Sequence, residues 1–173
     1  MADGVRIRSA IPADAGALAE VHRSTVLTAY AGIFPAHAPA PAIEDLVKDW
    51  KSAFSDTTFR AFLAEGPAGP VGTVGVRADP DVPGCGQLRR LHVLPEQWGQ
   101  GTGSALYEAA MEDLVNSGYG EASLWVLEKN PRARAFYERR GWALVAGQTL
   151  KWARLDLIEV RYRIPLPAPV CSD

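Results

Sequence analysis

Sulfur and long apolar runs are scarce in this chain. Its 173 residues contain only two cysteines, Cys85 and Cys171, which lie far apart in the sequence. Two thiols are too few for a disulfide framework, so we expect both to be reduced. Neither is favoured as a catalytic thiol, because Cys85 lies in a Gly/Pro turn and Cys171 in a Pro-rich tail. No apolar run approaches the roughly 18 residues that a membrane-spanning helix needs.

Net charge is also nearly absent, since 18 lysines and arginines face 20 aspartates and glutamates. The basic footprint of a nucleic-acid-binding protein is therefore missing. Three histidines, at 22, 37 and 92, lack the spacing of metal ligands, and no Cys or carboxylate cluster joins them. We expect neither a nucleic-acid partner nor a bound metal. Met1-Ala2-Asp3-Gly4 has no charged and apolar leader, which favours a cytoplasmic protein.

The apolar content, 47%, is enough for one domain with a sizeable core. We expect residues 1–166 to form that domain and residues 167–173 to form a Pro-rich tail. No pattern in the sequence defines the oligomeric state, although symmetric homodimers are the commonest assembly.

Hydrophobic periodicity predicts strands alternating with helices. The expected strands are 5–9, 58–64, 71–76, 88–93, 124–127, 143–146 and 157–164. The expected helices begin at Pro12 to Asp14, cover 43–54, run from the glycine turn to about Asn116, and begin at Pro131. Their core faces carry Leu18, Val21, His22, Thr25 and Val26, then Leu46, Val47 and Trp50, then Leu106, Tyr107, Ala110, Met111 and Leu114. This order predicts an α/β fold with a mixed sheet flanked by helices.

Three glycines, Gly99, Gly101 and Gly103, stand where a helix is expected to begin. Each sacrifices roughly 1 kcal/mol of helix propensity relative to alanine, so we infer that bare backbone is needed there. The first turn of a helix offers unpaired N–H groups and the positive end of the helix dipole. A phosphate group is the ligand that this arrangement favours. The alternative for the glycines alone is a tight strand-to-helix turn with no ligand.

Two common phosphate-binding templates fail at this turn. The third glycine of G-x-G-x-x-G would have to be Ser104 or Leu106, and the lysine of G-x-x-x-x-G-K-[ST] is missing. A nicotinamide enzyme, with Glu128 as its ribose-binding acid, is disfavoured for the same reason.

A second segment combines a strand, a helix cap and a helix. Leu124 to Leu127 form an apolar strand, Asn130 is placed to cap a helix, and Pro131 takes its first position. Gly141 supplies the stop signal.

Both segments resemble the GNAT superfamily of N-acetyltransferases. Its signature [RQ]-x-x-G-x-[GA] corresponds to residues 98–103, except that Trp98 replaces Arg or Gln. We interpret the Trp98 ring as a cover for the turn or the cofactor. Its second motif, N-x-R-A-x-x-F-Y-E-x-x-G-[FW], is matched by Asn130, Arg132, Ala133, Phe136, Tyr137, Glu138, Gly141 and Trp142.

This resemblance implies a GNAT-like α/β domain with a mixed, mostly antiparallel sheet of about seven strands and about four helices. It also implies acetyl-CoA as cosubstrate and direct acetyl transfer to a primary amine in a ternary complex. A splayed strand pair would form the cofactor slot, between 91–93 and 125–127. The implied cofactor-binding residues are Leu91, His92, Val93, Gly99, Gln100, Gly101, Thr102, Gly103, Ser104, Asn130, Ala133 and Tyr137.

The resemblance assigns the general acid for the departing thiolate to Tyr137. A tyrosine with a pKa near 10 is protonated at neutral pH and can donate that proton. By its pattern alone, Tyr137 also suits a core position. Arg132 and Arg134 could either bind the nucleotide phosphate or form a solvent-exposed face of the helix.

The general base and the acceptor stay open. Glu159, His92, His22 and a water relay are the candidates for the base, although Glu159 alternates like a solvent-facing residue and His22 like a core one. Aromatic residues of 30–34, with Trp50, Trp152 and Tyr162, suit either an apolar rim for the acceptor or the core. A non-catalytic acyl-CoA-binding module is the alternative function.

Overall fold

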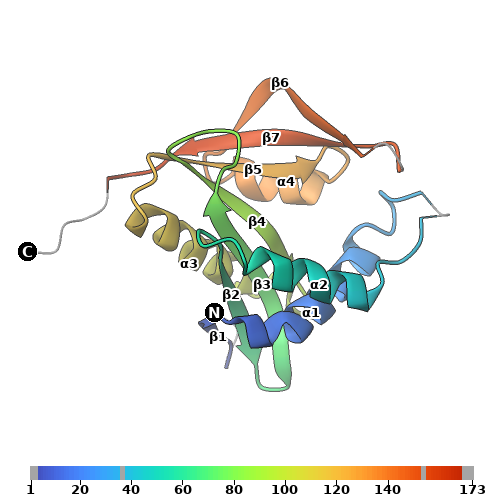
Figure 1. The fold of residues 1–173 in the computed structure, drawn as a ribbon. Helices are drawn as coiled ribbons and strands as arrows, with labels where there is room; N and C mark the ends of the chain where they lie inside the picture. Colours follow the sequence, from blue (N-terminus) through green and yellow to red (C-terminus); the bar gives the residue numbers. More distant parts are fainter. Residues whose placement is uncertain (1–3, 36–37, 153–154, 169–173) are drawn as a thin grey trace, which may run out of the picture.

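The computed structural model describes residues 4–35, 38–152 and 155–168. His37, Cys171 and most of the expected tail lie outside these ranges. Figure 1 shows the elements in order: β1 (Arg6–Ala10), α1 (Ala15–Ala29), α2 (Ile43–Ala53), β2 (Arg60–Gly66), β3 (Gly69–Ala78), β4 (Cys85–Val93), α3 (Thr102–Asn116), β5 (Glu121–Leu127), α4 (Pro131–Glu138), β6 (Ala143–Trp152) and β7 (Leu157–Pro165). Short 3-10 turns, Pro12–Asp14 and Pro95–Gln97, precede α1 and α3.

The seven strands form one sheet in the order β1-β2-β3-β4-β5-β7-β6. Only β4 and β5 pair in parallel, and the other neighbours are antiparallel. This topology confirms the predicted mixed, mostly antiparallel sheet, and β1 lies at its edge.

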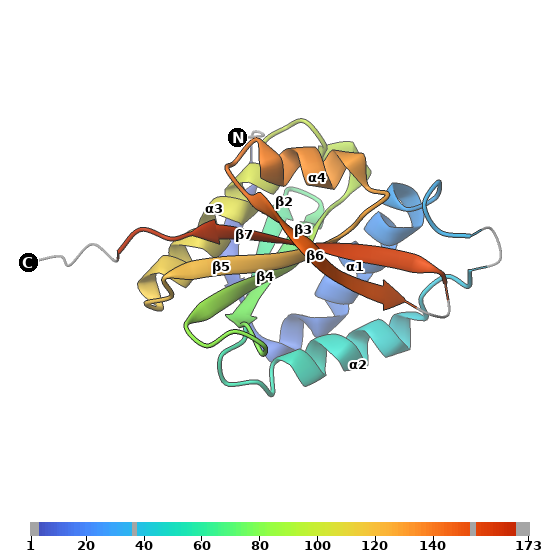
Figure 2. The same cartoon turned by 90° about the horizontal axis from the view of Figure 1, so that it is seen from above.

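Helices cover both faces of the sheet. Helices α1 and α2 lie against one face, while α3 and α4 lie on the other (Figure 2). Each side has its own apolar core, with Leu18, Trp50 and Leu63 on the first and Leu106, Leu114 and Val126 on the second. The predicted core faces of the first three helices are confirmed, because their apolar residues are buried or half-buried.

Several predicted strands were too short. β6 extends to Trp152 rather than 146, and β4 and β5 begin three residues earlier than expected. β6 is an edge strand whose side chains are nearly all exposed, and its pairing with β7 shifts between Leu144 and Thr149. A strand with two exposed faces lacks the alternation of apolar and polar residues from which strands are predicted, so its end was missed.

The central feature of the sheet is the separation of β4 from β5. The two strands pair only from Cys85 to Gln87, opposite Glu121 to Ser123. Beyond that point β4 stays with β3 and β5 stays with β7. A wedge therefore opens between them, as the predicted splayed pair requires.

A bulge in β4 changes the direction of its side chains at the wedge. Thr73 pairs with His92 and Gly75 with Arg89, so one residue of β3 faces two of β4. Arg90 lies in this bulge with φ of 54°, a left-handed conformation that is rare for arginine. Bulges of this kind bend a strand and redirect its side chains.

Candidate active site

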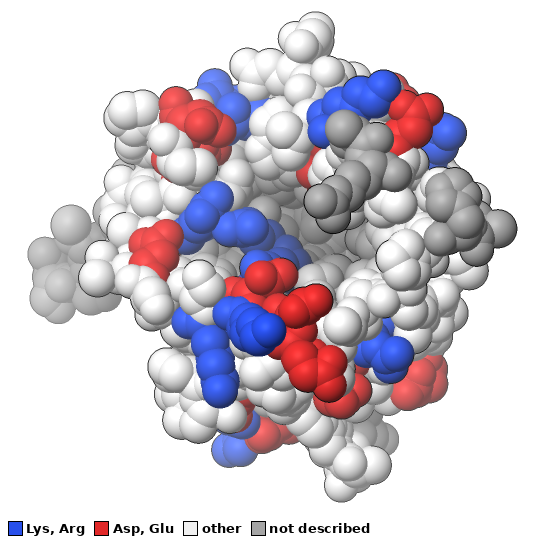
Figure 3. Space-filling view, turned by 45° about the vertical axis from the view of Figure 1, so that its right-hand side comes forward, with Lys and Arg blue, Asp and Glu red and all other residues white. Residues whose placement is uncertain are grey.

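A cleft of about 1340 Å³ occupies the wedge and extends to the glycine turn. Figure 3 shows it as a hollow with positively charged side chains along its wall. Most of the predicted site residues line it: His22, Leu91, His92, Val93, Gly99, Gly101, Gly103, Ser104, Asn130, Ala133, Tyr137 and Glu159. The chain thus brings both motifs and all three candidate bases to one cavity.

Among the twelve implied cofactor-binding residues, Gln100 and Thr102 do not line the cleft. The Gln100 amide donates to the Glu96 carbonyl over 2.5 Å on the exposed side of the turn. Thr102 is buried beneath the turn, with its hydroxyl 3.3 Å from Gln97 Oε1. Neither side chain therefore faces the cavity.

Two of the three glycines need their conformational freedom. Gly99 has φ of 77°, and Gly101, the N-cap of α3, has φ of 90°. These values strain any residue with a Cβ. At Gly103 an added Cβ would meet Val93 only at 3.6 Å, an ordinary contact, so backbone strain does not explain this glycine.

Trp98 lies next to the glycine turn, and the guanidinium of an arginine from α4 stacks on its ring. Its indole N–H donates to the Val93 carbonyl over 2.7 Å, which anchors the ring at the end of β4. The Arg132 guanidinium of α4 stacks 3.6 Å from the ring centroid. A positive charge thus stands beside residue 98 although the side chain there is uncharged.

Arg134 and Arg140, both within the second motif, differ in whether they line the cleft. Arg140 donates to Ser104 Oγ over 2.7 Å and lines the cleft. Arg134 instead donates to the buried Tyr162 hydroxyl over 2.9 Å and does not line the cleft. The expectation that Arg134 reaches a phosphate is therefore not supported by its position.

Tyr137 is both a core residue and a cleft residue. Its side chain is 8% exposed and packs edge-on against Phe136 and Trp142. Burial raises its pKa well above the usual value, and the nearby phenols of Tyr30 and Tyr107 add to the shift. The Tyr137 phenol is therefore protonated at neutral pH.

The predicted cap at the start of α4 is present. The Asn130 side-chain oxygen accepts from the Ala133 N–H over 3.0 Å, and Pro131 occupies the first helical position. This bond fixes the helix that carries Tyr137.

The two candidate histidines stack on each other at the inner wall of the cleft. The His22 and His92 rings lie 4.1 Å apart between centroids and nearly parallel. Burial lowers the pKa of His22 to about 4, helped by the Arg90 charge. Burial also lowers the pKa of His92, with further contributions from His22 and Arg90. Both rings are therefore neutral at neutral pH.

Glu159 is not the solvent-facing residue that its alternation suggested. It is half-buried, lines the cleft, and accepts a hydrogen bond from Trp152 Nε1 over 3.0 Å. Burial raises its pKa, against the opposing effects of that hydrogen bond and of Arg89. The sequence pattern did not reveal this, because the cleft that Glu159 lines is formed by residues far away in the sequence.

The aromatic residues also divide between the cleft and the core. Tyr30, Phe34 and Trp152 line the cleft. Trp50 and Tyr162 are fully buried in the core, so they form no rim.

Within residues 4–35, 38–152 and 155–168, no three His, Cys, Asp or Glu side chains gather where they could hold a metal ion. The same residues include no helix with the length and apolarity to cross a membrane.

Comparison with known proteins identifies the family. Residues 24–142 match the family model described as the Acetyltransferase (GNAT) family. The probable N-acetyltransferase Rv2775 of Mycobacterium tuberculosis is 27% identical over 176 residues, covering 95% of this chain and 96% of the relative.

Solved structures share the fold. An acetyltransferase from Thermus thermophilus superimposes with a TM-score of 0.73 at 25% identity, covering 96% of this chain and 100% of that one. The PaiA N-acetyltransferase of Thermoplasma acidophilum, solved in complex with coenzyme A, gives a TM-score of 0.71 at 19% identity, covering 93% and 99%.

The family match and the named relatives define the protein as an acyltransferase enzyme. The chain belongs to the GNAT family of acetyltransferases, which confirms the resemblance seen in its two motifs.

Proposed function

We propose that this acetyltransferase moves the acetyl group of acetyl-CoA directly to a primary amine within a ternary complex. The observation that carries the proposal is the wedge between β4 and β5, which joins the glycine turn to Tyr137 in one cleft. Pockets for a single small ligand have volumes of about 300 to 1,000 Å³, and this cleft is larger. Its size therefore favours two substrates bound together.

The glycine turn would hold the pyrophosphate of acetyl-CoA. The turn presents N–H groups at the start of α3, where the helix dipole favours an anion. Arg132, stacked on Trp98, supplies a cation at the motif position that lacks one. The pantetheine arm would then extend along the wedge past Asn130 and Ala133.

The acyl group would lie beside the unpaired edge of β4. Because β4 leaves β5 after Gln87, its backbone groups from Leu91 to Val93 have no partner strand on that side. The thioester oxygen gains negative charge as the amine attacks, and a backbone N–H aimed at it lowers the barrier.

Glu159 is the base that the cleft supports best. A buried carboxylate with a raised pKa accepts a proton more readily than an ordinary one, whereas lowered pKa values make His22 and His92 weak bases. The ammonium of the acceptor would give its proton to Glu159, and the neutral amine would then attack the thioester carbon.

Tyr137 would complete the reaction as general acid. The tetrahedral intermediate collapses with cleavage of the carbon–sulfur bond, and the thiolate of coenzyme A takes the phenol proton. Direct transfer also fits the position of Cys85, which is buried, donates to the Gly86 carbonyl and does not line the cleft.

The test measures thiol release from acetyl-CoA with a panel of primary amines, in wild type and in Tyr137→Phe. General-acid catalysis contributes about 100-fold or more, so we expect kcat to fall by at least that factor. Coenzyme A affinity, measured by calorimetry, should stay within about threefold, since the variant keeps the ring.

Tyr119→Phe is the matched control, because Tyr119 lies outside the cleft at the end of α3. It should retain wild-type kcat. A protein that binds coenzyme A but turns over no amine would be the non-catalytic binding module. Full activity of Tyr137→Phe would remove Tyr137 from the mechanism.

A further inference from the structure

Three arginines that the GNAT motifs do not include line the same cleft. Arg77 comes from β3, and Arg89 and Arg90 come from the bulged part of β4. All three are half-buried. Arg89 precedes Val93, the last residue of β4, by four residues, which is roughly 13 Å along the strand. The glycine turn begins only after Val93. We therefore infer that these arginines do not bind the nucleotide end of the cofactor.

These guanidinium groups have little internal compensation. Among the ion pairs of the described residues, none involves Arg77, Arg89 or Arg90. Arg77 donates to the neutral Gln87 amide over 3.0 Å. Arg90 donates to the Asp49 backbone carbonyl over 3.4 Å and stacks 4.6 Å from the Trp50 ring centroid.

A nearby arginine shows the usual alternative. Arg161 is more deeply buried than these three, but it pairs with the fully buried Asp79 carboxylate, which also accepts from Ser123. Burial is costly for a charge unless a partner compensates it. The arginines of the cleft therefore have capacity for an anion that the chain itself does not fill.

Arg89 is crowded by like charges. Burial lowers its pKa to about 10 and the charges of Arg77 and Arg90 add to the shift, against the smaller opposing effects of Glu159 and Asp56. The acidic side chains of the cleft are Glu159 and the exposed Asp49 and Asp81. An anionic ligand would relieve the repulsion within this group.

Arg89 and Glu159 both line the cleft, from β4 and β7 on its two sides. They lie close enough for each charge to shift the pKa of the other. A molecule whose amine lies at Glu159 therefore places its neighbouring atoms near Arg89. Tyr30, Phe34 and Trp152 provide an apolar wall beside them, with Tyr30 and Phe34 stacked 5.1 Å apart.

We infer that the acceptor is a small primary amine that also carries an anionic group, with the anion bound by Arg89 and Arg77 and the amine at Glu159. This inference rests on the proposed function and narrows its substrate class. A carboxylate, as in a free amino acid, and a phosphate, as in an aminoalkyl phosphate, share the required chemistry. Arginine binds either of them through two parallel hydrogen bonds.

The first experiment compares matched acceptors by their kcat/KM. L-phenylalanine is paired with phenethylamine, and O-phosphoethanolamine with ethanolamine, so that each pair differs in the anion. We expect the anionic member of one pair to be preferred by about 10-fold or more, as for a hydrogen-bonded charge pair. The preferred pair identifies carboxylate or phosphate as the anion.

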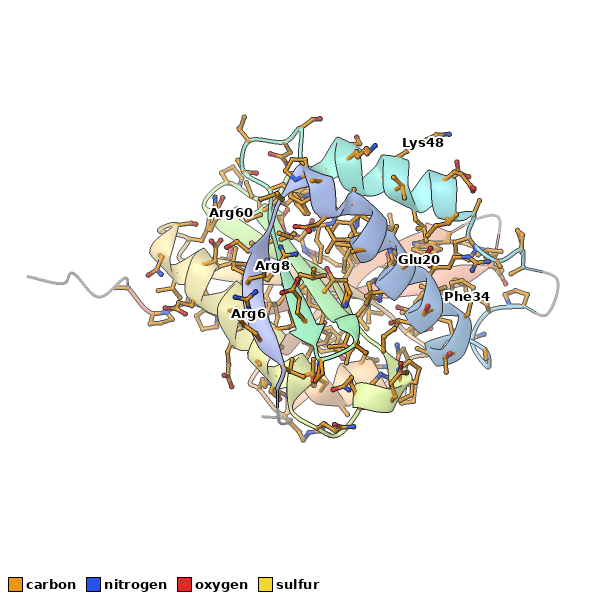
Figure 4. All side chains as sticks on the ribbon, turned by 90° about the horizontal axis from the view of Figure 1, so that it is seen from below. Arg6, Arg8, Glu20, Phe34, Lys48 and Arg60 are labelled. Carbon is orange, nitrogen blue, oxygen red and sulfur yellow. The ribbon has the colours of Figure 1, made fainter. Side chains whose placement is uncertain are left out.

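Arg89→Gln should reduce this preference by about 10-fold or more, so that both members of the pair react about equally well, while acetyl-CoA affinity is retained. Lys48→Gln removes the same charge from α2, where Figure 4 shows Lys48 pointing away from the body of the protein. That control should keep the preference. Arg77→Gln replaces Arg89→Gln if the latter does not fold, as judged by circular dichroism.

The second experiment measures binding without turnover. Calorimetry on the protein saturated with coenzyme A compares 3-phenylpropionate and phenyl phosphate with neutral 3-phenylpropionamide. One of the two anions should bind about 10-fold more tightly than the amide, and Arg89→Gln should abolish that difference.

The outcomes separate this inference from the proposed function. Arg89-dependent binding of an anion without acetylation of any amine would contradict the function and support the anion subsite. Acetylation with no preference for anionic acceptors, or a preference that survives Arg89→Gln, would overturn the inference and leave the function standing.

Discussion

At the residue scale, the proposed role of Glu159 as the base predicts how the reaction should depend on pH. A base acts in its deprotonated form, so kcat/KM should rise with pH through the Glu159 pKa and then level off. Burial places that pKa above the ordinary value of a glutamate. The groups around it are Trp152, which donates to it, and Arg89 and Tyr30, whose charges interact with it.

Glu159→Gln should lower kcat/KM about 100-fold and remove this acidic limb. If Tyr137 is the general acid, kcat/KM should not fall with rising pH below about pH 10, because the raised pKa of Tyr137 keeps the phenol protonated. The measurement is the pH profile of thiol release for wild type, Glu159→Gln and the control Glu128→Gln, whose exposed side chain lies outside the cleft. An acidic limb that persists in Glu159→Gln would assign the base to His22 or His92.

Single residues also show where sequence reasoning succeeds. Asn130 was predicted as a helix cap because capping depends on local chemistry that the residue type reveals. Gly101 was singled out as bare backbone for a phosphate, and its left-handed φ adds a conformational reason for the glycine. Arg89 was missed, since an arginine on a strand is typical of a solvent-facing position. Its exposure to the cleft depends on the β4 bulge, which includes Arg90. The positive φ of Arg90 could not be predicted from the sequence, because a left-handed conformation is normally recognised by a glycine and this residue is an arginine.

At the element scale, close contact between α3 and the sheet depends on glycine. A Cβ built on Gly86 of β4 would lie 2.5 Å from Leu114 Cδ2 and 3.0 Å from Tyr119 Cδ2, and one on Gly72 would lie 2.7 Å from Leu106 Cδ1. Leu106 and Leu114 are fully buried in the core, so an added Cβ would have to displace packed side chains. These two glycines therefore set the depth at which α3 packs.

Gly86→Ala should destabilise the protein by about 1 to 3 kcal/mol, the usual cost of overpacking a core. Thermal unfolding should show a lower Tm, by about 2 to 4 °C for each kcal/mol. Gly16→Ala is the matched control, because Gly16 lies in α1 with nothing within 4 Å of the added Cβ. That variant should be slightly more stable, and an unchanged Tm in Gly86→Ala would contradict the packing account.

Element boundaries were predictable only where local signals mark them. The starts of α2 and α4 follow from their sequence, whereas β6 was cut short at 146 because its exposed edge has no apolar period. The separation of β4 from β5 is a tertiary property. It was expected from family resemblance, not from the residues of either strand.

At the scale of the whole molecule, the fold follows from the order of the elements and the chemistry follows from the wedge. Alternating strands and helices predicted a mixed sheet between helices, and the sheet has that form. The cleft depends on three properties together, namely the splayed strands, the glycine turn and the helix that carries Tyr137. No single segment of the sequence contains that combination.

The most direct test of direct transfer is the pattern of initial velocities when acetyl-CoA and an accepted amine are varied together. Transfer within a ternary complex predicts intersecting reciprocal plots and an unchanged protein mass after incubation with acetyl-CoA alone. Parallel plots, with a protein that has gained an acetyl group before any amine is added, would show a covalent intermediate and contradict the account.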